Sequence, residues 1–388
     1  MKVYLDNGAT TMTDPKVVEA MKPLFSEKYG NPSSTHHMGQ EAKRELDEAR
    51  EIIAKKLKAR YDEIIFTSGG TESDNLAIKG AALANKDKGS HIITTKIEHP
   101  AVLNACKSLE KQGFRITYLD VDKQGFVNIS QLEENITDDT VLVSIIHGNN
   151  EIGTIQDIVS ISEICKRHTV LFHIDAVQSF TKVPIDVKKI HVDLISVSSH
   201  KIHGPKGVGA LYVRKGTRIS RMSDGGGHEF GLRAGTENVP GIIGFAKAVK
   251  LASDSDIGRI AKLRDMLIEG IHTSIPNTKL NGPERDKRLC NNVNMSFANV
   301  EGESLGSYLD IEGICTSTGS ACSSHSLEPS HVLLAIGLSK ELANGTIRMT
   351  LSRFTTEEEI MYTIDKLKKY TAKLRKISPL KRVLKHVL

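Results

Sequence analysis

The sequence predicts an α/β protein: a large domain built on a mostly parallel, seven-stranded sheet covered by helices, joined to a smaller α+β domain. Between about residues 60 and 215, short apolar runs alternate with amphipathic stretches of helical length. Strands separated by such helices need crossover connections, which give a parallel sheet with both faces covered. After Pro240 the pattern changes to long helices with fewer strands, and 388 residues are too many for one ordinary core.

The expected elements follow this pattern along the chain. Strands of the sheet are expected at Glu63–Thr67, His91–Thr95, Arg115–Leu119, Val141–Ile146, Val170–Ile174, Leu194–Val197 and Gly209–Val213. Helices are expected at Asn75–Leu83, Ala101–Gln112, Ile158–His168, Gly241–Ser253 and Ile257–Ile275. In the smaller unit, strands are expected at Asn292–Phe297 and Thr346–Leu351, and a capping box of Thr355 and Glu358 opens the last helix. We expect a large domain at 15–255 and a small domain formed by 1–14 with 256–388.

The composition excludes several classes of protein. A hydrophobic content of 39% and a charged content of 26% are typical of a globular chain, and the net charge of +5 is spread along it, which disfavours direct nucleic-acid binding. No apolar run reaches the roughly 20 residues of a membrane helix, and the N-terminus does not resemble a signal peptide. Five scattered cysteines without a C-x-x-C pair indicate neither a disulfide framework nor a structural zinc site. We therefore expect a cytoplasmic protein with free thiols and no bound metal.

Ligands of parallel sheets bind beyond the carboxyl ends of the strands, so the residues there are the first candidates. After the first strand, Gly69 and Gly70 lead into a helix on which Thr71 is expected as the N-cap, with Asp74 returning the bond. A helix N-terminus with free N–H groups suits a phosphate, although an ordinary capped turn has the same pattern. The P-loop pattern GxxxxGK[ST] is absent, which disfavours a nucleoside triphosphate.

Two further strand ends carry a carboxylate and a lysine. Asp175 follows a buried strand and needs a partner, either a pyridinium nitrogen or the N-terminus of the next helix. Lys201 follows the next strand in the run Ser198–Lys201, and a buried lysine is explained if its amine is used covalently; a surface lysine is the alternative. The order of these two residues favours a pyridoxal phosphate site. In isolation, His99 and Asn149 are better explained as structural residues, and Arg348 is equally well explained as one.

Together these motifs resemble one family, the cysteine desulfurases of the NifS/IscS type, which belong to the class V aminotransferases and have the type I fold of pyridoxal-phosphate enzymes. The resemblance rests on the order and spacing of motifs that span nearly the whole chain: Tyr4–Thr11, Gly30–Ser34, Gly69–Ser73, His99, Asn149–Gly153, Asp175–Gln178, Ser198–Lys201, Arg348 and Ser352–Phe354.

The resemblance implies a role for each site residue. Lys201 would bind the cofactor covalently and move protons, Asp175 would pair with the pyridinium nitrogen, Gln178 would bind the phenolic oxygen, and His99 would stack on the ring. The phosphate would be held by Gly70, Thr71, Ser198 and His200, and by Thr236 of the second subunit of a homodimer. Asn149 would contact the cofactor and, with Arg348, bind the carboxylate of L-cysteine.

The resemblance also implies that Cys322 takes the sulfur of L-cysteine as a persulfide and leaves alanine. Cys322 lies in a small, polar stretch, expected to be a mobile loop at about 314–330, where an incidental cysteine is the alternative. The sulfur would pass to an iron–sulfur scaffold protein or to tRNA thiolation, with Cys322 as a conceivable transient cluster ligand. The basic tail with Lys381, Arg382, Lys385 and His386 would bind an acidic face of the acceptor.

Two other functions and one departure from the family pattern stay open at this point. A selenocysteine lyase or cysteine-lyase relative would share the cofactor but have little need of Cys322. A non-catalytic protein of the same fold would serve as a docking platform. The departure is Phe230, which stands where the family pattern has an arginine and puts the local interface in doubt.

Overall fold

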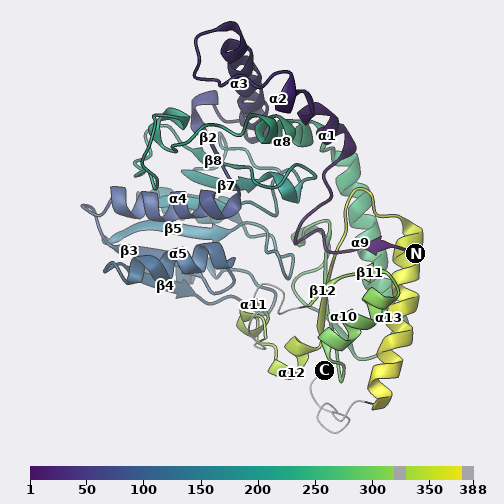
Figure 1. Cartoon of the computed structure of the whole chain (residues 1–388). Coiled ribbons are helices and arrows are strands. Elements are labelled where there is room, and N and C mark those ends of the chain that lie inside the picture. The colour runs from purple at the N-terminus through teal and green to yellow at the C-terminus, as the bar shows by residue number, and fades with distance from the viewer. Residues whose placement is uncertain (319–328, 378–388) are drawn as a thin grey trace.

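The computed structural model describes residues 1–318 and 329–377. Cys322 and the tail residues Lys381, Arg382, Lys385 and His386 therefore lie outside the described residues. The described chain forms a large sheet with helices on both faces and a smaller unit beside it (Figure 1).

The larger sheet has the mostly parallel arrangement that the sequence predicts. Its described strands are, in spatial order, β2 (Ile64–Thr67), β8 (Gly209–Val213), β7 (Leu194–Ser198), β6 (Leu171–Asp175), β5 (Thr140–Ile146), β3 (His91–Thr95) and β4 (Arg115–Leu119). The pairs from β7 to β4 are parallel, whereas β8 is antiparallel to both of its neighbours. The carboxyl ends of β5, β6 and β7 therefore meet at one edge of the sheet.

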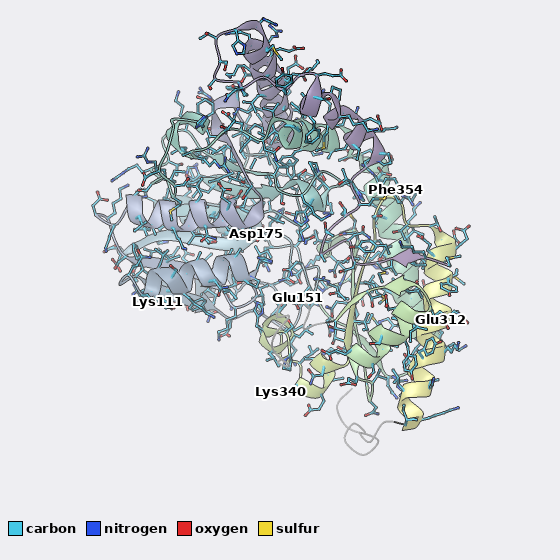
Figure 2. The ribbon with its side chains drawn as sticks, in the orientation of Figure 1. Lys111, Glu151, Asp175, Glu312, Lys340 and Phe354 are labelled. Carbon is cyan, nitrogen blue, oxygen red and sulfur yellow. The ribbon has the colours of Figure 1, made fainter. Side chains whose placement is uncertain are left out.

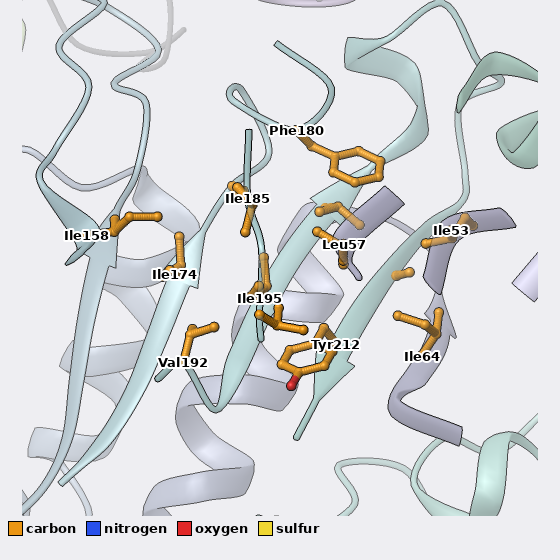
Figure 3. Packing of buried hydrophobic residues seen from close by; sticks show 14 of the residues in the cluster. Ile53, Leu57, Ile64, Ile158, Ile174, Phe180, Ile185, Val192, Ile195 and Tyr212 are labelled. Atoms are coloured by element: carbon orange, nitrogen blue, oxygen red, sulfur yellow. The ribbon is translucent and has the colours of Figure 1, made fainter. Parts of the chain in front are cut away.

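Helices cover both faces, so that successive residues of one strand enter different cores. Ile65 and Leu194 pack under α4 (Gly70–Ala84) and α5 (Pro100–Glu110), while Ile64 and Ile195 belong to the core on the opposite face. Figure 3 shows that second core around Phe180, Ile195 and Tyr212. The other helices of this part are α1 (Pro15–Met21), α2 (Pro23–Ser26), α3 (His37–Leu57), α6 (Ile129–Asn135), α7 (Ile158–Arg167) and α8 (Val239–Leu251). Burial on both faces explains why these strands are continuous apolar runs.

The smaller unit has its own hydrophobic core, made of residues 3–5 and 260–374. Its described strands are β9 (Thr278–Leu280), β10 (Asn292–Phe297), β12 (Ser317–Thr318) and β13 (Thr346–Thr350) in an antiparallel sheet, and β1 (Val3–Tyr4) paired with β11 (Ile314–Cys315). Its helices are α9 (Asp254–Ser274), α10 (Gly302–Ile311) and α13 (Glu357–Ile377), with α11 (His331–Ala335) and α12 (Lys340–Asn344) at the junction (Figure 1). The N-terminal strand thus belongs to the core formed by the C-terminal third.

Two local expectations are wrong. The capping box before α13 is formed by Thr356 and Glu359, one residue later than expected, because each side chain accepts a bond from the other's backbone N–H. Helix α4 begins at Gly70 rather than Asn75, with Gly69 as its N-cap, so Thr71 lies in the first turn and its hydroxyl is not needed as a cap. Among the described residues, no helix is both long and apolar enough to cross a membrane.

Candidate active site

A cavity of about 380 Å³ lies at the carboxyl ends of β5, β6 and β7, between the two parts of the molecule. Figure 2 shows Asp175 and Glu151 in this junction. Most of the predicted site residues line the cavity: Gly70, Thr71, His99, Asp175, Gln178, Ser198, His200, Lys201 and Arg348. Asp6, Gly8, Ala9, Asp74, Asn150 and Ser317 also line it, and sequence reasoning did not single them out as site residues.

Lys201 ends the short 3₁₀ helix η2 (Ser199–Lys201), which follows β7 directly. Its Nζ donates hydrogen bonds to the backbone carbonyls of Gly8 and Ala9, both at 2.7 Å. The side-chain amide of Gln178 donates to the same Gly8 carbonyl at 2.8 Å. The N-terminal segment therefore fixes the positions of both side chains at the cavity wall.

Asp175 is the last residue of β6 and is buried, with Oδ1 accepting a bond from the backbone N–H of Val177 at 2.9 Å. Burial raises the pKa of its carboxyl to about 6, against the lowering effects of that bond and of Lys201. Asp74 lies nearby, and burial together with the charge of Asp175 raises its pKa well above the usual range. Asp175 thus ionises more readily than Asp74 and is the carboxylate suited to a cationic ring nitrogen.

His99 is the N-cap of α5, and its Nδ1 accepts a bond from the backbone N–H of Ala101 at 3.1 Å. Burial, with a smaller contribution from Lys201, lowers the pKa of the imidazole to about 4. The ring is therefore neutral at physiological pH, with its proton on Nε2. His99 is therefore a structural cap that also lines the cavity.

The start of α4 and the end of β7 together fit a phosphate group. The hydroxyl of Ser198 is buried and has no hydrogen-bond partner within the described part of the chain. A Cβ on Gly70 would lie 2.6 Å from Cγ2 of Val177, so a residue without a side chain lets the first turn of α4 open onto the cavity. His200 lies alongside, with its Nδ1 3.2 Å from the Thr10 hydroxyl. An unpartnered hydroxyl beside a helix N-terminus is a donor set that suits phosphate oxygens.

Asn149 does not occupy the place expected for it. Its side-chain amide donates to the Ile97 carbonyl, and its Oδ1 accepts from the backbone N–H groups of Glu151 and Ile152, all at 2.9 Å. It is fully buried and does not line the cavity, whereas Asn150 does. The Oδ1 of Asn150 is buried without a partner among the described residues. Because the Asn149 side chain is needed to shape the turn, Asn150 is the better candidate for a ligand contact.

Arg348 reaches the cavity from β13 of the smaller unit. Its Nη1 donates to the backbone carbonyl of Asn150 at 3.2 Å, and its Nη2 donates to Oδ1 of Asp6 at 3.1 Å. The side chain is 5% exposed, and its Nε has no partner in residues 1–318 and 329–377. An arginine held this way offers an unused N–H to a carboxylate in the cavity.

Thr236 and Cys322 are the remaining predicted site residues. Thr236 is exposed and does not line it within one chain. Cys322 is outside the described residues, although Ser317, just before that gap, lines the cavity and pairs with Arg348 in the sheet. Phe230 packs edge-on against Tyr61 and next to Arg50, which forms a buried two-pronged pair with Glu229. The departure at Phe230 is thus accommodated within the chain and lies apart from the cavity.

Comparisons with known proteins agree with this geometry. Residues 3–362 match the family described as aminotransferase class-V. The chain is 56% identical over 384 residues to cysteine desulfurase IscS of Dictyoglomus turgidum, covering 98% of this chain and 97% of the relative. It is 52% identical over 381 residues to cysteine desulfurase IscS of Methanosarcina thermophila, covering 97% and 94% respectively.

Solved structures are similar over nearly the whole chain. A NifS-like protein superposes with a TM-score of 0.90 at 41% identity, covering 96% of this chain and all of that one. A structure of SspA in complex with cysteine superposes with a TM-score of 0.83 at 38% identity, covering 92% of this chain and all of that one.

Proposed function

Since the chain belongs to the class-V aminotransferase family and is a pyridoxal-phosphate-dependent cysteine desulfurase, we propose that its reaction is carried out by Lys201, Asp175, Arg348 and Cys322. The observation that carries this assignment is the single cavity wall that joins Lys201, Asp175 and Arg348 from distant parts of the chain. The division into a domain at 15–255 and one at 1–14 with 256–388 is part of the proposal, supported by the separate core of the smaller unit.

The bound cofactor supplies an electron sink for negative charge at the substrate's α-carbon. Gly70, Thr71, Ser198 and His200 hold its phosphate, and Gln178 binds its phenolic oxygen. The Asp175 carboxylate would pair with the protonated ring nitrogen, since it is the more acidic of the two buried carboxyls. The His99 ring would stack on the cofactor as a neutral imidazole, since its lowered pKa leaves it uncharged.

Arg348 and Asn150 orient L-cysteine by its carboxylate. Among the described residues, Nε of Arg348 and Oδ1 of Asn150 are both buried without a partner, and Nη1 of Arg348 donates to the Asn150 carbonyl. The guanidinium provides the charge, and the amide of Asn150 provides a neutral donor once its side chain is turned. Lys201 lines the same cavity, and its amine moves the proton of the α-carbon.

Cys322 accepts the sulfur. Its thiolate attacks the substrate sulfur, an S–S bond forms, and the bond between sulfur and the β-carbon breaks. The electron pair of that bond stays with the β-carbon, which takes a proton and becomes the methyl group of alanine. An acceptor protein, such as an iron–sulfur scaffold, then removes the persulfide sulfur, with the basic tail 378–388 as its docking segment.

The oligomeric state and the cellular compartment are also part of the proposal. A homodimer brings Thr236 of a second copy to the phosphate, which is consistent with its exposure in the single chain. The reaction takes place in the cytoplasm, where Cys322 stays reduced; Cys106, Cys165, Cys290 and Cys315 are free thiols here.

Replacement of Cys322 tests the assignment directly. In Cys322→Ala, single-turnover formation of alanine from L-cysteine should fall by more than about 100-fold, with the cofactor absorbance unchanged. Cys315→Ala, seven positions earlier in the chain, is the matched control and should keep its activity. Alanine formed at the normal rate by Cys322→Ala would instead indicate a lyase that releases sulfur without a protein thiol.

A further inference from the structure

Asp6 is hydrogen-bonded to Arg348, the arginine proposed above to bind the substrate carboxylate. The carboxylate of Asp6 lines the cavity, and its Oδ1 accepts a bond from Nη2 of Arg348 at 3.1 Å. The two residues are 342 positions apart and meet because the N-terminal segment runs beside β13, where Asp6 bridges to Thr350. The Asp6 side chain is 22% exposed and that of Arg348 only 5%, so the aspartate can move or be hydrated more easily than the arginine.

Two nitrogens of the guanidinium already have partners. Nη1 is bonded to the Asn150 carbonyl, and Nε is buried without a partner among the residues that the structure describes. Nε and Nη2 share one edge of the planar group, which is the geometry of a two-pronged carboxylate contact. The Asp6 carboxylate already sits on Nη2, so a substrate carboxylate that uses this edge must share that nitrogen with Asp6 or displace it.

The charges of these groups also favour competition between Asp6 and a substrate carboxylate for Arg348. Arg348 carries one positive charge, and the Asp6 carboxylate already balances it. A substrate carboxylate brings a second negative charge within a few ångströms of the first, and like charges at that distance repel. Because Asp6 is partly exposed to water, the repulsion is screened and its effect on affinity is moderate.

We propose that Asp6 is an affinity-determining residue that takes the place of the substrate carboxylate on Arg348 in the free enzyme and competes with the amino acid for it. The proposal rests on the role of Arg348 given above. The pairing keeps the buried arginine satisfied while no amino acid is bound. It also weakens the binding of L-alanine, which carries the same carboxylate as L-cysteine, and so favours release of the product.

Equilibrium binding of L-alanine to the holoenzyme tests the proposal, followed through the cofactor absorbance or by calorimetry. In Asp6→Asn, the Kd of L-alanine should fall by a factor of about 3 to 10, since the competing charge is gone while the shape of the side chain is kept. The Kd of L-alaninamide, which lacks the carboxylate, should not change. A fall for both ligands, no fall, or weaker L-alanine binding in Asp6→Asn would overturn the proposal.

Three further variants make the result interpretable. Asp14→Asn removes the charge from a comparable pair, Asp14 with Arg353 at 2.5 Å, away from the cavity, and should leave both Kd values unchanged. Asp6→Ala removes the same charge by a different route and should also tighten L-alanine binding. Arg348→Lys separates the two levels of the argument. If it does not weaken L-alanine, the proposed substrate contact itself is wrong; if it does and Asp6→Asn has no effect, only the role of Asp6 is wrong.

Discussion

Three buried carboxyls, those of Asp74, Glu98 and Asp175, lie around the end of β6, and their surroundings separate their acidities. Glu98 accepts bonds from the Thr95 hydroxyl at 2.6 Å and from the backbone N–H of Ile146 at 3.1 Å, while its Oε2 has no partner in the described chain. Burial is the main reason that the pKa of Glu98 rises to about 8, with a further contribution from Asp175. At neutral pH the negative charge is therefore concentrated on Asp175.

This arrangement predicts how stability depends on pH. The folded pKa of Glu98, about 8, lies above its unfolded value of 4.5, so the folded protein holds a proton that the unfolded chain has lost between these values. Its contribution to the free energy of unfolding is complete below pH 4.5 and is lost as the pH rises to about 8. The free energy of unfolding of Glu98→Gln should not show this loss. Relative to the wild type, it should rise by on the order of 3 kcal/mol as the pH increases from 5 to 9.

Denaturant unfolding at pH 5, 7 and 9 measures the effect, with Glu134→Gln on the exposed side of α6 as the control. The control should follow the wild type at each pH. An equal pH dependence in Glu98→Gln and the wild type would show that Glu98 is ionised in the folded protein, and that the burial argument is wrong.

At the same scale, the sequence predicted residues whose chemistry is evident from their position after a strand, such as Asp175 and Lys201. It missed Asn150 because the choice between two adjacent asparagines depends on the direction of each side chain in the turn. It missed Asp6 as a contact of Arg348 because the two residues are far apart in sequence and come together only through the packing of the smaller unit.

Among elements, the strands of the large sheet were predictable because burial on both faces leaves continuous apolar runs of the right length. Helix termini were less predictable. Side chains of similar type compete for the cap, as Thr355 and Thr356 do before α13, and glycine replaced a hydroxyl as the cap of α4. Helices α11 and α12 pack on Ile97, Ile146 and Ile152 of the large part, a contact that no local pattern indicates.

Helix α11 carries a prediction about sulfur transfer. Its N-cap, Ser330, accepts bonds from the backbone N–H groups of Val332 and Leu333 and donates its own hydroxyl proton to Glu151 at 2.5 Å. Ser330 follows Cys322 by eight positions in the sequence, so this contact anchors the chain shortly after Cys322. Glu151→Ala should slow transfer of sulfur to Cys322 about tenfold, because the oxygen that accepts the Ser330 hydroxyl bond is lost while the helix cap remains.

Glu151→Gln keeps an acceptor oxygen and should retain most of the rate. The Kd of L-alanine and the cofactor absorbance should be the same in both variants, since neither Glu151 nor Ser330 lines the cavity. If Glu151→Ala weakens L-alanine binding as much as it slows sulfur transfer, Glu151 supports the whole cavity and not the Cys322 segment in particular.

For the whole molecule, the cavity exists because two units with separate cores pack together. The large sheet supplies Lys201 and Asp175, and the smaller unit supplies Arg348 and, through the N-terminal strand, Asp6. The sequence predicted both units from a change in periodicity near Pro240. It could not predict the packing between them, which depends on single contacts such as Arg348 with the Asn150 carbonyl.

One proposed part of the site is missing from a single chain, and this predicts complementation between subunits. If Thr236 completes the phosphate site of the second copy, each site of a homodimer uses Lys201 from one chain and Thr236 from the other. A mixed dimer of a Lys201→Ala chain and a Thr236→Val chain then contains one site with both changes and one site with neither. Because the unchanged site keeps every phosphate contact, the mixed dimer should bind cofactor at that site with wild-type affinity and have about half of the wild-type activity.

If Thr236 serves its own chain instead, the only site with a lysine also carries the valine. The mixed dimer would then show the weakened cofactor affinity of the Thr236→Val homodimer, which cofactor titration of the purified, differently tagged pair distinguishes.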